Sequence, residues 1–132
     1  MHAYFDKDGS PKVKIKIAGT KRKGKEITAL LDTGHNGSLS LPLLDLIEIG
    51  AELVNFGPVN LADGSQTNTY FFNVKVEIDG KTKDTQASMI PNPNIYEAII
   101  GLELLSPYVA VINFNKKQIL LKTEEQLKKG IK

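Results

Sequence analysis

This sequence of 132 residues contains no cysteine, and it has no long apolar run. Without cysteine the chain cannot form disulfides, zinc–thiolate sites or a thiol nucleophile. No apolar segment approaches the roughly 20 residues that a membrane-spanning helix needs. The first residues also lack the basic and then apolar order of a signal peptide. We therefore expect a cytoplasmic protein that has no membrane partner.

A broad basic surface is also missing, although the formal net charge is +2. Lys12, Lys14 and Lys16 alternate with apolar residues, so we expect these lysines on the solvent-facing side of a half-buried strand. The dense basic cluster at residues 21–25 includes a glycine and lies between two strand patterns, as the tip of a polar hairpin would. A nucleic-acid surface usually combines a larger basic stripe with aromatic residues. The chain is therefore not expected to bind nucleic acid.

Long helical periodicity and interdomain linkers are scarce as well. Hydrophobic residues make up 41% of the chain and charged residues 24%, which suits one hydrophobic core at this length. Alternation with a period of two residues dominates the pattern. The sequence therefore predicts a single domain over residues 1–132 with an all-β, mainly antiparallel fold, built as a small barrel.

Turn residues divide the chain into short predicted elements. Asp63-Gly64 and Asp79-Gly80 are strong signals for hairpin turns. The residues around His2 are expected to form a tail. We expect strands at residues 12–18, 26–31, 38–41, 53–61, 67–74, 73–78, 82–90, 98–100, 109–114 and 118–122. Residues 42–47, 102–105 and 124–129 are candidates for helix, and the fold is expected to contain one or two short helices.

An acidic residue at the end of a buried strand is the most informative feature that the chain does have. Asp32 follows the apolar residues 27–31 and precedes Thr33 and Gly34. Aspartate is depleted in strands and is costly to bury unless it is paired or hydrogen-bonded. We therefore expect the two leucines before Asp32 to direct its carboxylate toward an apolar interior.

Three motifs in this order resemble the retropepsin-like aspartic proteases of clan AA. They are Asp32-Thr33-Gly34, the turn Ala62-Asp63-Gly64-Ser65 and the strand pattern Ile99-Ile100-Gly101. The leucines and proline of residues 39–42 make the small bacterial and archaeal members the closest. The resemblance covers residues 12–122 and implies a retropepsin-like acid-protease barrel.

The chemistry of this family implies an aspartic-type endopeptidase that needs two carboxylates. One takes a proton from water while the other donates a proton to the carbonyl oxygen of the peptide. Because this chain has a single Asp-Thr-Gly, the resemblance implies a homodimer in which Asp32 meets its symmetry mate. The pair would share one proton, which gives a bell-shaped dependence of rate on pH. No metal or organic cofactor is required, and the other partner is a peptide or protein substrate.

The resemblance also assigns roles to individual residues. Asp32, Thr33 and Gly34 form the catalytic triplet, in which Thr33 hydrogen-bonds across the dimer axis and Gly34 admits the substrate backbone. Gly101 packs against the catalytic loop. The implied substrate-binding residues are Leu30, Gly34, His35, Leu39 and Ile99, with Ala62, Asp63, Gly64 and Ser65 as the tip of a flap that bonds an extended peptide. Mainly apolar subsites predict apolar side chains near the scissile bond.

Two positions depart from the retroviral pattern. His35 stands where alanine or serine is usual, and we expect it to contact substrate or to be a plain loop residue. A metal role is not expected, because the only other histidine is His2 and no ligand spacing appears. Leu102 and Asn36 occupy the places of an arginine and an aspartate that pair in the viral enzymes. Dimer packing is therefore expected to differ from that of the viral enzymes.

Simpler interpretations stay open. Asp-Thr-Gly can be a turn, residues 62–64 a plain hairpin, and residues 99–101 a core strand before a helix. The same dimeric fold could also serve as a catalytically silent peptide-binding or scaffolding module. A basic nucleic-acid binder would need residues 21–25 to face a continuous positive surface.

Overall fold

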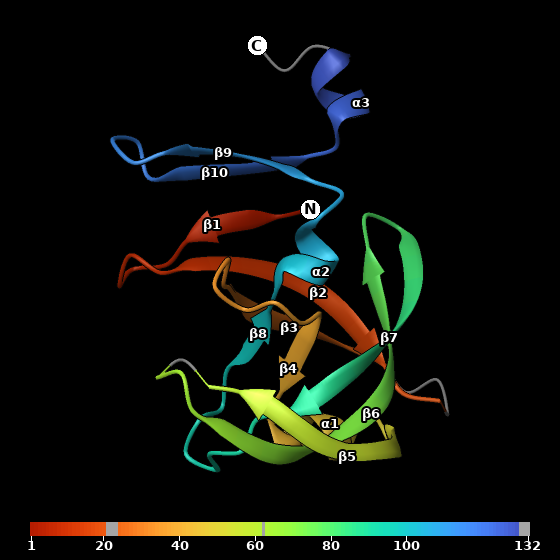
Figure 1. Ribbon diagram of the computed structural model, residues 1–132. Helices are drawn as coiled ribbons and strands as arrows, with labels where there is room; N and C mark the ends of the chain where they lie inside the picture. Colours follow the sequence, from red (N-terminus) through yellow and green to blue (C-terminus); the bar gives the residue numbers. More distant parts are fainter. Residues whose placement is uncertain (21–23, 62, 130–132) are drawn as a thin grey trace.

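The computed structural model of the protein describes residues 1–20, 24–61 and 63–129. Ten strands and three short helices occur within these ranges (Figure 1). The strands are β1 (Ala3–Phe5), β2 (Pro11–Ala18), β3 (Gly24–Leu31), β4 (Leu39–Leu41), β5 (Glu52–Asn60), β6 (Gln66–Ile78), β7 (Lys81–Met89), β8 (Ala98–Ile100), β9 (Val109–Asn113) and β10 (Gln118–Lys122). The helices are α1 (Leu43–Glu48), α2 (Leu102–Leu105) and α3 (Glu124–Lys128).

The described strands form a closed barrel with a small second sheet beside it. Eight strands follow the order β1-β2-β3-β8-β4-β7-β6-β5, and an additional pairing of β2 with β6 closes the middle six into a barrel. Most neighbours are antiparallel, while β3 with β8 and β4 with β7 are parallel. The β9–β10 hairpin forms the second sheet, next to β1 (Figure 1). The expected mainly antiparallel β-barrel is therefore confirmed.

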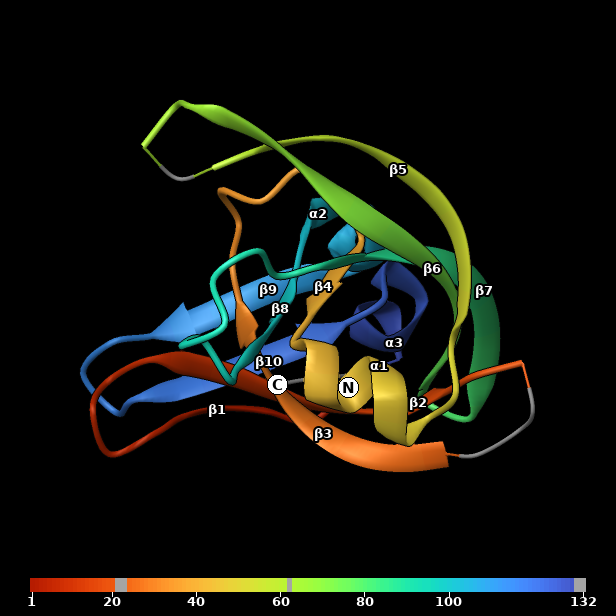
Figure 2. The same cartoon turned by 90° about the horizontal axis from the view of Figure 1, so that it is seen from below.

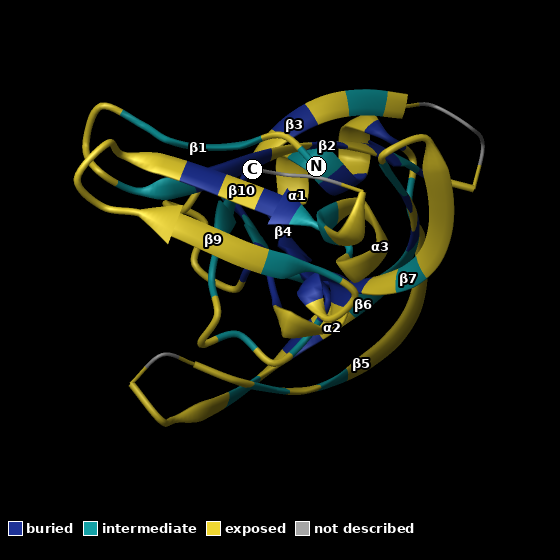
Figure 3. Ribbon diagram, turned by 90° about the horizontal axis from the view of Figure 1, so that it is seen from above, coloured by how far each residue is buried: buried dark blue, intermediate teal, exposed yellow. Residues whose placement is uncertain are grey.

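Alternating side chains on the barrel strands build the core. On β2, Val13, Ile15 and Ile17 are all buried, and their neighbours on the strand face the other side. All three residues of β4 are buried: Leu39 and Leu41 belong to the hydrophobic core, and Ser40 on the other face contacts His35 and Ser88. Figure 3 shows the buried segments gathered in the middle of the molecule. Each fully buried aliphatic side chain contributes about 1.5–3 kcal/mol through removal of apolar surface from water, so these strands hold the barrel together.

The helices are short and depend on tertiary contacts. Lys25 on β3 donates hydrogen bonds to Asp45 (2.7 Å) and Glu48 (2.6 Å), which ties α1 to the barrel and raises the pKa of Lys25. Thr123 caps α3 by accepting a hydrogen bond from the Gln126 N–H (3.2 Å). All three candidate helical segments are helical, so the described chain has one helix more than the expected one or two.

Two expected boundaries differ from the structure. Residues 67–74 and 73–78 were separate strands in the sequence interpretation, but β6 runs without a break over 13 residues. Its first part pairs with β5 and its second with β7 and β2, so two hairpins share one long strand. The expected tail around His2 is instead close to β1, which pairs with β2. Pairing partners that are distant in sequence decide both features.

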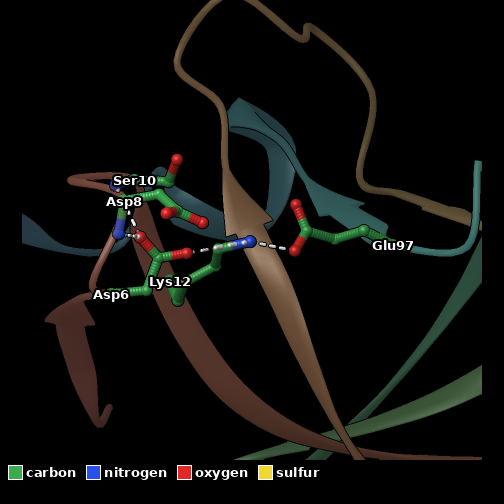
Figure 4. A network of polar contacts seen from close by, with 5 residues as sticks. All are labelled: Asp6, Asp8, Ser10, Lys12 and Glu97. Carbon is green, nitrogen blue, oxygen red and sulfur yellow. Dashed lines mark hydrogen bonds and ion pairs between the residues drawn. The ribbon is translucent and has the colours of Figure 1, made fainter.

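The expectation for Lys12 was wrong. Lys14 and Lys16 are exposed as expected, but Lys12 is only 8% exposed. Its ammonium group forms an ion pair with Glu97, and Asp6 Oδ2 lies 3.6 Å from it (Figure 4). The outer face of β2 is covered at this end by the turn after β1 and by the residue before β8. A buried lysine is retained because two carboxylates compensate its charge.

The position of this ion pair relates it to β3. Because β2 and β8 lie on opposite sides of β3, a side chain of β2 that reaches Glu97 must cross the face of β3. Lys12 is the register partner of Leu30, two residues before Asp32. Hydrogen bonds from the N–H groups of Ser10 and Asp8, together with Lys12, hold the pKa of Asp6 below its usual value. The cluster therefore anchors the end of β3 from which Asp32 projects.

Replacing Glu97 with alanine should lower the free energy of unfolding by about 1–3 kcal/mol, because it removes the nearer partner of a buried charge. Glu77→Ala is the matched control, since its partner Lys16 is exposed and 3.6 Å away, and it should cost about 0.5 kcal/mol or less. Urea denaturation of both variants measures the difference. Equal losses would show that Lys12 does not depend on Glu97.

Candidate active site

Asp32 lies at the start of an irregular segment, residues 32–38, which we call the Asp32 loop. The loop joins β3 to β4 and begins where the Asp32 N–H donates to the Ile100 carbonyl (3.1 Å) on β8. The Asp32 Oδ1 atom accepts the Gly34 N–H (2.9 Å), and the Asp32 carbonyl accepts the His35 N–H (3.1 Å). These bonds form a tight turn that holds the carboxylate in one orientation.

The sequence interpretation expected the Asp32 carboxylate to point into the core, and this expectation was wrong. Asp32 is half-buried, and Thr33 and Gly34 are exposed. The strand ends at Leu31, so the turn lifts the carboxylate to the surface of the protomer. A Cβ atom on Gly34 would lie 3.2 Å from Asp32 Oδ1, which explains the glycine as the space for this carboxylate. The triplet is therefore accessible to a ligand or to another protein chain.

Backbone N–H groups at the start of α2 donate hydrogen bonds to the Asp32 loop. The Gly101 N–H donates to the Ser38 carbonyl (2.9 Å), the Leu102 N–H to the His35 carbonyl (2.8 Å) and the Glu103 N–H to the Gly37 carbonyl (3.2 Å). Irregular backbone is stable when such polar groups are paired. The three bonds attach the loop to the N-terminal end of α2.

Gly101 leaves no space for a side chain at this contact. A Cβ atom there would overlap the Gly37 carbonyl oxygen and would lie 2.5 Å from both the carbonyl oxygen and the ring Cδ2 of His35. The backbone at Gly101, between β8 and α2, therefore packs directly on the Asp32 loop. This contact agrees with the close packing that the resemblance implied for Gly101.

Of the three apolar residues expected to contact substrate, two lie side by side and the third is buried in the core. Leu30 and Ile99 are direct register partners on β3 and β8, and both are half-buried. Leu39 is 1% exposed and belongs to the core. Its side chain packs in the core and is not accessible from the surface of the chain. The expected apolar lining therefore reduces to Leu30 and Ile99, beside the charged pair of Lys12 and Glu97.

His35 lies differently from a residue that contacts substrate. Its Nε2 atom lies 3.3 Å from Ser40 Oγ, and Ser40 Oγ lies 2.6 Å from Ser88 Oγ. Both serines are buried. The ring is folded inward, under the loop, and we did not anticipate its serine partners from the sequence. A serine between the leucines of residues 39–41 was the available signal, because a polar group in so buried a strand needs a partner.

The β5–β6 hairpin ends in a tight turn at residues 61–65, of which Ala62 lies outside the described residues. Gly64 has a φ of +85°, which favours glycine. Asp63 Oδ1 accepts bonds from the hydroxyl (2.5 Å) and the N–H (2.9 Å) of Ser65, and these bonds lower the pKa of Asp63. Figures 1 and 2 show this tip on the same side of the molecule as the segment that joins β3 to β4.

Two hollows in the described part of the molecule lie away from the Asp32 loop. They measure about 410 and 390 Å³, lie around the C-terminal end of β2, the start of β3 and the adjoining parts of β6 and β7, and are lined by none of the expected site residues. Within the described ranges, no group of three or more His, Asp or Glu side chains could hold a metal ion. None of the described helices is long and apolar enough to cross a membrane.

The barrel, with its aspartate loop seated on β8 and α2, has the retropepsin-like fold. A solved structure with the same fold is the EIAV protease complexed with the inhibitor HBY-793. The two chains are 18% identical and superpose with a TM-score of 0.56 over 77% of this chain and 90% of the viral chain. No protein-family model and no curated protein matches the sequence. At this identity the likeness establishes the fold.

Gly101→Ala should destabilise the protein by roughly 1–3 kcal/mol, because the new methyl group overlaps backbone atoms of the Asp32 loop. Gly24→Ala is a suitable control, since its nearest atom would be the Ile17 carbonyl oxygen at 3.5 Å, an ordinary contact. Thermal unfolding of both variants measures the difference. A Gly101 variant as stable as the Gly24 variant would contradict the close packing.

Proposed function

We propose that this chain is an aspartic endopeptidase that acts as a homodimer on extended peptide segments. The observation that carries the proposal is the Asp32-Thr33-Gly34 turn, accessible at the surface and held rigidly on a retropepsin-like barrel. We further infer that the small bacterial and archaeal members of the family are its nearest functional relatives and that it works in the cytoplasm.

The reaction uses Asp32 and the same aspartate of a second copy. The ionised carboxylate takes a proton from a water molecule, whose oxygen attacks the carbonyl carbon of the peptide. The protonated carboxyl donates its proton to the carbonyl oxygen, giving a tetrahedral intermediate. This intermediate collapses with cleavage of the C–N bond, and the leaving amine takes a proton from the pair. One protomer supplies one carboxylate, so the proposed site is complete only in the dimer.

The neighbouring residues have supporting roles in this proposal. The exposed Thr33 would bond to its counterpart across the dimer axis, and Gly34 would leave room for the substrate backbone. Leu30 and Ile99 would provide apolar contact near the scissile bond. The tip formed by Asp63, Gly64 and Ser65, with Ala62, would act as a flap that bonds the substrate as an added strand.

A second candidate is a catalytically silent peptide-binding module with the same dimeric fold. The resemblance in fold is compatible with both functions, because fold does not determine activity. The intact triplet favours the enzyme, since pairing two carboxylates costs free energy that a passive binding site has no reason to spend.

Asp32→Asn should reduce peptide cleavage by a factor of roughly 10²–10⁴ or more, because it removes the proton acceptor. Mass spectrometry of an unstructured peptide library, from acidic to neutral pH, detects the products. Asp84→Asn on the exposed face of β7 is the matched control and should cleave like the wild type. Equal cleavage by the Asp32 variant would rule out this aspartate as the catalyst, and binding without cleavage by the wild type would favour the silent module.

Mixing wild-type chains with an excess of the Asp32→Asn variant should suppress cleavage below the level of the wild-type chains alone. Mixed dimers hold one aspartate and one asparagine, so they lack one of the two required carboxyl groups. Activity measured against the mixing ratio, after equilibration, gives the test. Strict additivity of the two preparations would mean that each chain acts independently.

A further inference from the structure

His35 links Asp32, at the start of the Asp32 loop, to β4, the strand that follows the loop. Its backbone N–H donates to the Asp32 carbonyl (3.1 Å), while its Nε2 atom contacts Ser40 (3.3 Å), in the middle of β4. Ser40 in turn contacts Ser88 on β7 (2.6 Å). A continuous series of contacts therefore runs from Asp32, through the backbone and side chain of His35, to Ser40 on β4 and Ser88 on β7.

The space around the ring is closed by glycines. A Cβ atom on Gly101 would lie 2.5 Å from His35 Cδ2, and a Cβ atom on Gly37 would lie 3.2 Å from His35 Nε2. The imidazole therefore fills the space that side chains at these two positions would need. The ring is half-buried, and its Nε2 atom is directed to Ser40.

We propose that His35 is a positioning residue for Asp32, which it holds through Ser40 and Ser88. This inference rests on the proposed function and adds to it the part that keeps the carboxylate aligned. His35 touches no reacting atom, because its Nε2 is directed to Ser40. Asn36 is neutral and Leu102 is apolar, so these two residues cannot form the ion pair that the viral enzymes have at their positions. In this chain His35 provides the stabilising contact instead.

The direction of the bonds explains why the imidazole suits this role. Nε2 can donate to Ser40 Oγ or accept from it, depending on the tautomer. The two serine hydroxyls can each donate or accept, so the bonds from Nε2 to Ser40 and from Ser40 to Ser88 can form in either tautomer. Buried polar networks of this kind favour one geometry, because an unpaired member costs free energy. The backbone of residue 35 transmits that geometry to Asp32 through a single peptide hydrogen bond and the loop.

The test compares His35→Ala, His35→Gln and Ser40→Ala in the full chain. A glutamine amide can reach about as far as imidazole Nε2 and can bond to Ser40, whereas alanine cannot. We expect kcat to fall roughly 10–100-fold in His35→Ala, with KM changed less than about threefold, since small misplacements of a catalytic group have effects of this size. His35→Gln should recover most of kcat. Ser40→Ala should lower kcat, and the double variant His35→Ala, Ser40→Ala should lose little more than either single variant.

Amide hydrogen exchange gives a second measurement that does not depend on activity. In His35→Ala, exchange of the backbone amides of residue 35, Gly101 and Leu102 should accelerate at least about tenfold. The amides of β10, remote from the loop, should be unchanged. Unaltered kcat or unaltered exchange in the loop would overturn the positioning role. A wild type that cleaves nothing would instead overturn the proposed function, and the exchange would still decide whether the imidazole holds the loop.

Discussion

The packing of the Asp32 loop on the junction of β8 and α2 is the constraint on which the candidate site depends. The loop has irregular backbone, so its carbonyl groups need partners, and the N–H groups of Gly101, Leu102 and Glu103 provide them. Such close approach of two backbones is possible because residue 101 has no side chain. The parallel pairing of β3 with β8 brings these segments together although they are distant in sequence. The position of the candidate site is therefore a consequence of how β3 and β8 pair in the barrel.

The carboxylate at this site is accessible, which relates the structure of one chain to the proposed dimer. Asp32 is half-buried and its two followers are exposed, while the strands beneath them are packed. A single carboxylate can take or give a proton but cannot do both in one step, so a second group is needed for the proposed hydrolysis. The likeness to the EIAV protease concerns the fold, and the activity follows only from the chemistry argued for the triplet.

Polar residues inside the molecule organise the surroundings of the triplet. Lys12 crosses β3 to reach Glu97, and Ser40 and Ser88 meet His35 under the loop. Lys12, Ser40 and Ser88 are buried, so each would destabilise the protein without its partner. These pairs make the geometry around Asp32 specific, in addition to the stability that the apolar core provides. The wall beside Leu30 is consequently mixed in character, apolar at Ile99 and charged at Glu97.

The local sequence was sufficient for the barrel class and the turn at Asp32, because period-two alternation and turn chemistry are properties of neighbouring residues. The close packing of Gly101 followed instead from the resemblance of the motifs to a known family. The local sequence could not determine the burial of Lys12 and Leu39, the inward direction of His35 or the single long β6. Alternation says which residues share a face of a strand, but it does not say what covers that face. Asp6 and Glu97 flank the ammonium group of Lys12, and Leu39 packs in a core built from strands that are distant in sequence, so segments far apart in the chain decided these environments. The chemical groups were set by the sequence, and their surroundings were set by tertiary packing.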